Sequence, residues 1–307
     1  MIRIGVAGWD YPDWAGIVYP APLPRRFDRL SCVAAILDVV EVNVTFYRPV
    51  DPKTSRSWAT RVPSDSSFLF TAKLHRAFTH DRSDDLEAPA GAYLAGVEPL
   101  RRSGRLGAVL MQFPHAFHDR RESRGRLSRV VDLLPGLPLV AEFRHRSWDN
   151  GEALAFLKDL GVGFCNIDQP SLGSTLPPTE HVTSRIAYVR LHGRNAANWF
   201  AGKEIRRQTP AGVRGGARYD YLYSLEELQP WVERIRRLAG SAEEVIVIAN
   251  NHYRGKAPAN ALMLKSALSG RRVQAPSGLI AAYPGLELSA DPLEPTPRDR
   301  PEQGRLF

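Results

Sequence analysis

Short apolar runs rich in β-branched residues recur along the chain, and segments with helical spacing separate them. The runs are Ile2–Ala7, Val39–Val44, Phe68–Leu74, Gly107–Phe113, Leu139–Phe143, Gly163–Ile167, Ala187–Leu191 and Val245–Ala249. Strands that alternate with helices favour a parallel sheet, because parallel neighbours need a crossover connection between them. Eight parallel strands close a barrel that its own side chains fill. The pattern therefore predicts an α/β fold, namely a single-domain (β/α)8 TIM barrel.

Two connections depart from the regular alternation. The segment between Asp168 and Arg185 is rich in Pro, Ser and Thr where the sixth helix of the barrel is due, and a long loop follows Leu191. Long loops without secondary structure are usually functional. We expect the barrel to span residues 1–270 and a Pro-rich extension to span 271–307, with disorder from about Ser289 onward.

Polar and charged side chains end nearly every predicted strand. The C-terminal ends of barrel strands carry the active site in TIM-barrel enzymes, because the loops that follow them converge there. Charged groups in this position are costly to bury unless they pair with one another. The residues in question are Glu41, Asn43, Lys73, Gln112, Glu142, Arg144, Asp168, Arg190, His192 and Asn250. Together they predict a functional site at the mouth of the barrel.

The residue types at this mouth suggest a division of roles. The catalytic candidates are Glu41, Glu142, Asp168 and His192, because carboxylates accept protons and a histidine titrates near neutrality. Lys73, Arg144 and Arg190 are suited to hold an anion. The other candidates for substrate binding are Asn43, Tyr47, Gln112, Trp148, Arg194, Trp199 and Asn250. The alternative interpretation is a structural ion-pair network that joins Glu142 to Arg144 or Arg190, and Glu41 to Lys73.

Composition and charge narrow the class of protein. The chain has 307 residues, two cysteines and a net charge of +8. No signal peptide or membrane span is recognisable, so we expect a cytoplasmic protein that does not bind membranes. The positive charge is compatible with an anionic small molecule or a nucleic acid as partner, although a solvated basic surface is the simpler explanation. No metal-binding spacing occurs. We therefore expect no cofactor, while a divalent metal is not excluded.

Several stretches together resemble the YecE-like family, domain of unknown function 72. The stretches are 41–47 (EVNVTFY), 70–73 (FTAK), 112–114 (QFP), 142–148 (EFRHRSW), 190–194 (RLHGR), 218–221 (RYDY) and 250–252 (NNH). The resemblance covers nearly the whole chain to about Leu268 and implies a TIM barrel. It implies no reaction. The related metal-dependent barrels use sets of histidines and carboxylates, whereas this chain has Lys73, Arg144 and Arg190 at the mouth.

The last five residues, Gln303-Gly304-Arg305-Leu306-Phe307, are similar to the peptide by which bacterial proteins bind the replication sliding clamp. Gln303, Leu306 and Phe307 match that peptide, but Gly304 stands where a leucine is usual. A disordered tail with an apolar end is suited to docking. Chance similarity is the alternative.

Two hypotheses about function follow from these observations. In the first, the chain is an enzyme of the hydrolase or lyase type that acts on a phosphorylated or nucleic-acid-derived substrate, with carboxylate and histidine acid–base chemistry. In the second, it is a non-catalytic accessory protein that binds nucleic acid or is recruited by the sliding clamp.

Overall fold

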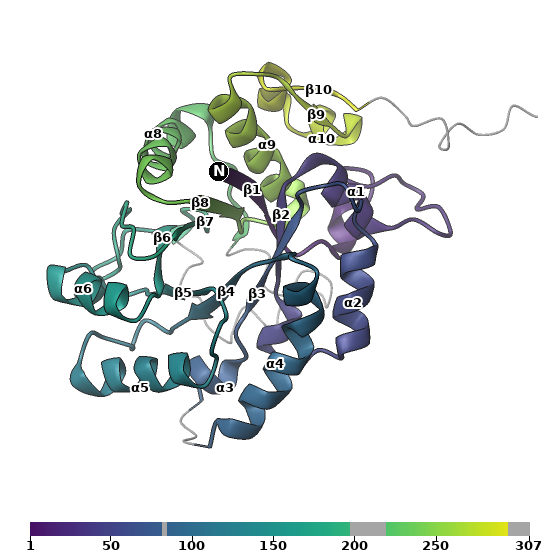
Figure 1. Ribbon diagram of the computed structural model, residues 1–307. Helices are drawn as coiled ribbons and strands as arrows, with labels where there is room; N and C mark the ends of the chain where they lie inside the picture. Colours follow the sequence, from purple (N-terminus) through teal and green to yellow (C-terminus); the bar gives the residue numbers. More distant parts are fainter. Residues whose placement is uncertain (82–84, 197–218, 294–307) are drawn as a thin grey trace, which may run out of the picture.

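Eight parallel strands pair in chain order and close into a barrel in the computed structural model, which describes residues 1–81, 85–196 and 219–293 (Figure 1). The strands are β1 (Ile2–Ala7), β2 (Val39–Val42), β3 (Leu69–Lys73), β4 (Leu106–Gln112), β5 (Leu139–Glu142), β6 (Gly163–Asp168), β7 (Ile186–Leu191) and β8 (Glu244–Ala249). Each lies within two residues of its predicted bounds. The predicted TIM barrel is confirmed.

Helices surround the barrel in the described part of the chain (Figure 1). They are α1 (Arg29–Ile36), α2 (Pro52–Thr60), α3 (Arg76–Thr79), α4 (Glu87–Arg102), α5 (Arg121–Asp132), α6 (Gly151–Asp159), α8 (Leu225–Ser241), α9 (Lys256–Ser269) and α10 (Ser277–Ala282). Local sequence explains several starts. The Asp28 side chain caps α1, Asp51 precedes the first-turn proline of α2, and Ser224 forms a capping box with Glu227 at α8.

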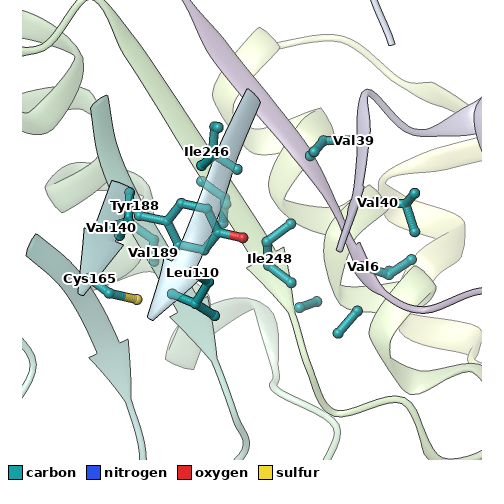
Figure 2. Packing of buried hydrophobic residues seen from close by; sticks show 14 of the residues in the cluster. Val6, Val39, Val40, Leu110, Val140, Cys165, Tyr188, Val189, Ile246 and Ile248 are labelled. Atoms are coloured by element: carbon teal, nitrogen blue, oxygen red, sulfur yellow. The ribbon is translucent and has the colours of Figure 1, made fainter. Parts of the chain in front are cut away.

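The barrel closes because its first strand, β1, pairs with its last strand, β8. β1 pairs with β2 on one side and with β8 on the other, with Ile2 opposite Val245 and Gly5 opposite Val39. The barrel interior is packed with side chains, and Figure 2 shows the Tyr188 ring inside it near Leu110 and Ile248. Because the interior is filled, a ligand can approach the charged strand ends only from the mouth.

The two irregular connections that the sequence predicts follow β6 and β7. Residues 169–185, between β6 and β7, contain no helix, as the sequence predicts. Side-chain hydrogen bonds hold this segment against the barrel instead, such as the one from Thr183 Oγ1 to the carbonyl of Val162, at 2.6 Å. Of the second connection, residues 197–218 lie outside the described residues, and Trp199 is among them.

The segment after α9 adds to the outer layer of the fold. Strands β9 (Val273–Ala275) and β10 (Ala290–Pro292) pair in parallel, and α10 lies between them. Leu279 and Leu286 of this segment are fully buried. The prediction of disorder from about Ser289 is wrong at its start, because β10 is paired with β9 there. Residues 294–307 lie outside the described part of the chain, and the clamp-like residues Gln303, Leu306 and Phe307 fall among them.

Within the described residues, no helix combines the length and the apolar character that a membrane crossing requires.

Candidate active site

Two carboxylates and one guanidinium form the centre of the site. Glu41 at the end of β2, Glu142 at the end of β5 and Arg190 on β7 are all fully buried. Arg190 donates from Nη2 to Glu41 Oε1 at 2.7 Å and from Nη1 to Glu142 Oε2 at 2.5 Å. One arginine thus joins three strands across the barrel and compensates the burial of both carboxylates.

A layer of hydroxyl groups lies one step deeper in the barrel. Tyr188, two residues before Arg190 and on the same face of β7, donates from its hydroxyl to Glu41 Oε2 at 3.1 Å. Its oxygen lies 2.8 Å from Thr71 Oγ1 on β3. The single phenolic proton is engaged by Glu41, so Thr71 is the donor in the second contact. Tyr188 therefore fixes the orientation of Glu41 from below.

Two further cations lie toward the opening. Arg144 Nη2 is 2.5 Å from Glu142 Oε1, and Lys73 Nζ is 3.9 Å from Glu41 Oε1. Their side chains are 10% and 16% exposed, whereas both carboxylates are 0% exposed. Arg144 is held in place by Gln169, whose Oε1 accepts from its Nη1 at 2.9 Å. The positive groups are therefore the ones within reach of solvent.

His192 completes the cluster as a neutral imidazole. Asn250 Nδ2 donates to His192 Nδ1 at 2.9 Å, so the ring proton is on Nε2, which lies 3.4 Å from Glu142 Oε1. Burial and the positive charge of Arg144 lower the pKa of His192 well below its usual range. The expectation that His192 titrates near neutrality does not fit this environment.

The same charges act in opposite directions on Glu142 and Lys73. Burial by itself would raise the pKa of Glu142, but Arg144 and Arg190 outweigh it and lower that pKa well below the usual range. Burial, and then the charge of Arg190, lower the pKa of Lys73 to about 8. A carboxylate with so low a pKa is a poor proton acceptor, whereas an amine with a pKa of about 8 exchanges protons near neutrality.

Asp168 does not belong to the cluster, contrary to the sequence-based prediction. On β6 the inward-facing residue is Cys165, whose sulfur lies 3.9 Å from Glu142 Oε2. Asp168 is on the opposite face by alternation and points to α8. Its carboxylate accepts from Arg194 Nε at 2.9 Å, from the Tyr223 hydroxyl at 2.9 Å and from Trp231 Nε1 at 2.6 Å. Asp168 and its partner Arg194 thus fasten the end of β6 to the helix layer.

Replacing Asp168 by asparagine is expected to lower the free energy of unfolding by about 1–3 kcal/mol, because an amide cannot accept from all the donors that converge there. Binding of sulfate, used as a probe of the anion site predicted at Lys73, Arg144 and Arg190, is expected to be unchanged. Chemical denaturation and calorimetry measure the two effects. Asp291→Asn is the matched control, since the exposed Asp291 pairs only with Arg272 among the described residues. Loss of sulfate binding with unchanged stability would show that Asp168 contributes to the site after all.

The remaining candidates divide between the mouth and other places. Gln112 accepts from Arg190 Nη1 at 3.2 Å, and Asn43 lies just after β2, at the start of a short 3-10 turn. Trp148 is fully buried, stacks on Phe143 with ring centroids 4.0 Å apart, and donates to the carbonyl of Phe117. It stabilises the loop and is not available to a ligand. Tyr47 is 69% exposed beside the mouth.

Two residues near the mouth, Tyr188 and Tyr11, were missing from the predicted set. Tyr188 lies within the apolar run Ala187–Leu191, and its even spacing from Arg190 and His192 indicates the inner face. Tyr11 stacks on His252 with ring centroids 4.4 Å apart and an interplanar angle of 11°. Burial lowers the pKa of His252 to about 4. The position of Tyr11 in a loop gave no periodic signal.

The described residues contain no group of side chains placed to bind a metal ion. Nowhere in residues 1–81, 85–196 and 219–293 do three or more His, Cys, Asp or Glu side chains lie together in a way that could hold a metal ion.

The barrel and its charged mouth define the class: a TIM-barrel protein with a mixed-charge site at the C-terminal ends of its strands. The family described as "Protein of unknown function DUF72" matches residues 3–281, and the chain belongs to this family. It is 28% identical over 274 residues to the UPF0759 protein YunF of Bacillus subtilis, a match that covers 85% of this chain and 92% of YunF.

Solved structures agree with this assignment. The chain is similar to a DUF72 family protein from Thermotoga maritima, with 31% identity, a TM-score of 0.74, and coverage of 88% of this chain and 99% of that one. A DUF72 family protein from Enterococcus faecalis is 26% identical with a TM-score of 0.74, over 88% of this chain and 96% of its own. The resemblance to the YecE-like family is thereby confirmed.

Proposed function

We propose that this protein is an enzyme of the hydrolase or lyase class that acts on a small substrate carrying a phosphate group, nucleic-acid-derived phosphates included. The observation that carries the proposal is the order of charges with depth. The two carboxylates are fully buried, while the Lys73 amine and the Arg144 guanidinium face the opening. Three cations accompany two carboxylates, so the mouth retains positive charge for an anion.

In this proposal Lys73 transfers the proton and Arg144 binds the phosphate. With a pKa of about 8, a fraction of Lys73 is neutral at physiological pH. The neutral amine takes a proton from an attacking water in a hydrolase, or from a carbon of the substrate in a lyase, and the resulting ammonium returns it to the leaving group. Glu41 and Glu142 then serve to hold the cations, since the pKa of Glu142 is well below the range that proton transfer needs.

Sulfate binding tests the cationic mouth, because the charge of sulfate does not change between about pH 6.5 and about pH 9.5. Wild type is expected to bind sulfate more weakly as the pH rises through about 8, where Lys73 loses its charge. Lys73→Arg is expected to bind without this inflection, because a guanidinium stays charged. Lys73→Met is expected to bind at least roughly tenfold more weakly at neutral pH, as expected when a charged hydrogen bond is lost.

Isothermal calorimetry at two ionic strengths measures these affinities. A sulfate affinity in wild type that does not change with pH, or an undiminished affinity in Lys73→Met, would contradict the proposed role of the amine. Turnover of phosphate esters and phosphorylated hydroxy acids is the catalytic test. Sulfate binding without turnover of any of them would favour the binding-protein alternative.

A further inference from the structure

A second recess adjoins the charged mouth and has a different chemistry. It has a volume of about 640 Å³ and lies between the loop after β1, the end of β2 and helix α2. Its aromatic lining consists of Trp9, Tyr11, Phe27 and Trp58. A volume of this size is in the range of about 300–1,000 Å³ that small-molecule sites occupy.

The aromatic side chains form a corner that fits a flat ring. Trp9 and Trp58 meet edge to face, with centroids 5.6 Å apart and an interplanar angle of 83°. The edge of one ring therefore covers one face of the other, and a flat ligand stacks on the ring surface that remains open rather than between the two rings. Gly8 makes the turn into this loop with φ of +79°, and a Cβ there would lie 2.7 Å from the Tyr11 hydroxyl. Only glycine therefore allows Tyr11 to fold back over the recess.

The charged residues of the recess are already compensated. Arg29 pairs with Asp10 and Arg61 pairs with Asp28, with Arg61 Nε 2.8 Å from Asp28 Oδ2. These cations are thus neutralised, unlike the excess of positive charge at the mouth. The recess favours an uncharged ring over a phosphate.

Asn43 supplies a directional contact. It lines the recess, and its Oδ1 is buried and accepts no hydrogen bond from the described residues. A buried acceptor without a donor is unfavourable, so a ligand whose N–H group draws the Asn43 amide toward the recess removes that cost and gains affinity. Asparagine recognises adenine through such an acceptor, because the exocyclic amine of adenine is a donor.

Asn43 also connects the recess to the mouth. β2 and β3 pair up to Val42 opposite Ala72, and Thr45, two residues after Asn43, donates from Oγ1 to the carbonyl of Lys73 at 2.7 Å, so the turn that begins at Asn43 rests on the end of β3. Tyr11, which lines the recess, stacks on His252, whose pKa the Lys73 charge helps to lower. One ligand can therefore reach from the aromatic corner to the amine.

We propose that this recess binds an adenine-type nucleobase and that the substrate is a nucleoside phosphate, its base stacked on Trp9 in the aromatic corner and its phosphate at Lys73 and Arg144. The assignment of both groups to one ligand rests on the anionic substrate proposed above. The base site itself follows from the recess alone.

Adenosine, which has no charge, probes the recess separately from the mouth. Calorimetric titration into the full chain is expected to show binding that Trp9→Ala weakens by on the order of 10- to 100-fold, because the base loses its stacking partner. Phe156→Ala is the matched control, a half-buried aromatic of α6 that does not line the recess, and is expected to bind as wild type does. Lys73→Met is expected to retain adenosine binding while it loses sulfate binding.

Two comparisons between ligands still test the proposal if Trp9→Ala folds poorly. Purine riboside lacks the exocyclic amine and is expected to bind wild type more weakly than adenosine, a difference that Asn43→Leu abolishes. Adenosine monophosphate is expected to bind wild type more tightly than adenosine, and this advantage is expected to vanish in Lys73→Met. An equal affinity for adenosine monophosphate and adenosine in wild type would show that base and phosphate do not share one ligand.

No adenosine binding at millimolar concentration, or tighter binding of a plain sugar such as methyl glucoside, would overturn the nucleobase site. If sulfate binding keeps its dependence on Lys73 in that case, the proposed function at the mouth stands without the base site. If adenosine binds and sulfate does not, the base site stands without the proposed function at the mouth.

Discussion

Replacing Arg190 by methionine is expected to lower the free energy of unfolding by about 3–5 kcal/mol at neutral pH, the usual cost of leaving a buried charge without its partner. The reason is that Glu41 and Glu142 both lose the guanidinium that they share inside the barrel. Methionine has a similar length and leaves little empty space, so the loss reports charge rather than packing. Denaturant unfolding followed by circular dichroism measures it.

The dependence on pH separates this explanation from a packing defect. In wild type the pKa of Glu142 is lowered on folding, so its ionised form stabilises the fold above the unfolded pKa, and this contribution is lost as the pH falls through the folded value. In Arg190→Met, burial acts on Glu142 with one arginine fewer, which raises its pKa. The difference in stability between variant and wild type is therefore expected to shrink as the pH falls from about 7 to about 5.

Two variants serve as controls for Arg190→Met. Arg237→Met removes an arginine that is 56% exposed and pairs with Glu180, and we expect an effect within about 0.5 kcal/mol. Adding Glu142→Gln to Arg190→Met is expected to restore part of the stability, since it removes one of the two stranded charges. A loss below about 1 kcal/mol that does not change with pH would show that the carboxylates find other compensation.

Replacing Lys73 by methionine is expected to lower kcat by about 10²- to 10⁴-fold on any phosphorylated substrate that wild type converts, the usual contribution of a positioned acid–base group. In wild type kcat is expected to rise with pH through the range of Lys73, because only the neutral amine accepts a proton. A bound phosphate stabilises the ammonium, so the midpoint in the complex is expected above the value of about 8 for the free site.

Lys73→Arg separates binding from catalysis. The guanidinium keeps the positive charge and therefore the anion, but it does not deprotonate in this range. We expect this variant to bind sulfate normally and to have no measurable turnover. A Lys73→Arg variant that turns over substrate at the wild-type rate would move the proton-transfer role to another group, with Glu142 the first to consider.

Much of this site could be predicted from the order of polar residues along the strands. Glu41, Lys73, Glu142, Arg144 and Arg190 end separate apolar runs, and parallel strands bring such ends to one mouth. The alternative ion-pair network that the sequence suggests is also present, since Glu142 pairs with both arginines. The network does not exclude a functional mouth, because two of its cations reach the opening.

What the sequence could not give is the face on which a polar residue lies. Barrel strands are buried on both faces, and β6 is buried at all six positions, so alternation in burial gives no direction. Glu142 and Asp168 have the same kind of strand end, yet one points into the barrel and the other to α8. Trp148 is comparable, because an aromatic residue after a strand can line a site or fill the space under a loop.

The shared arginine also constrains how the chain is made. Glu41 leaves the ribosome 149 residues before Arg190, which is roughly 7–30 s at a bacterial rate of about 5–20 residues per second. Until then this carboxylate has no guanidinium to pair with and must stay hydrated. In a nascent chain that stops before β7, the strand ends at the mouth therefore cannot close over Glu41. A half-length fragment that carries β1 to β4 would therefore be open to water at this end, and release of an incomplete product would expose it to proteolysis.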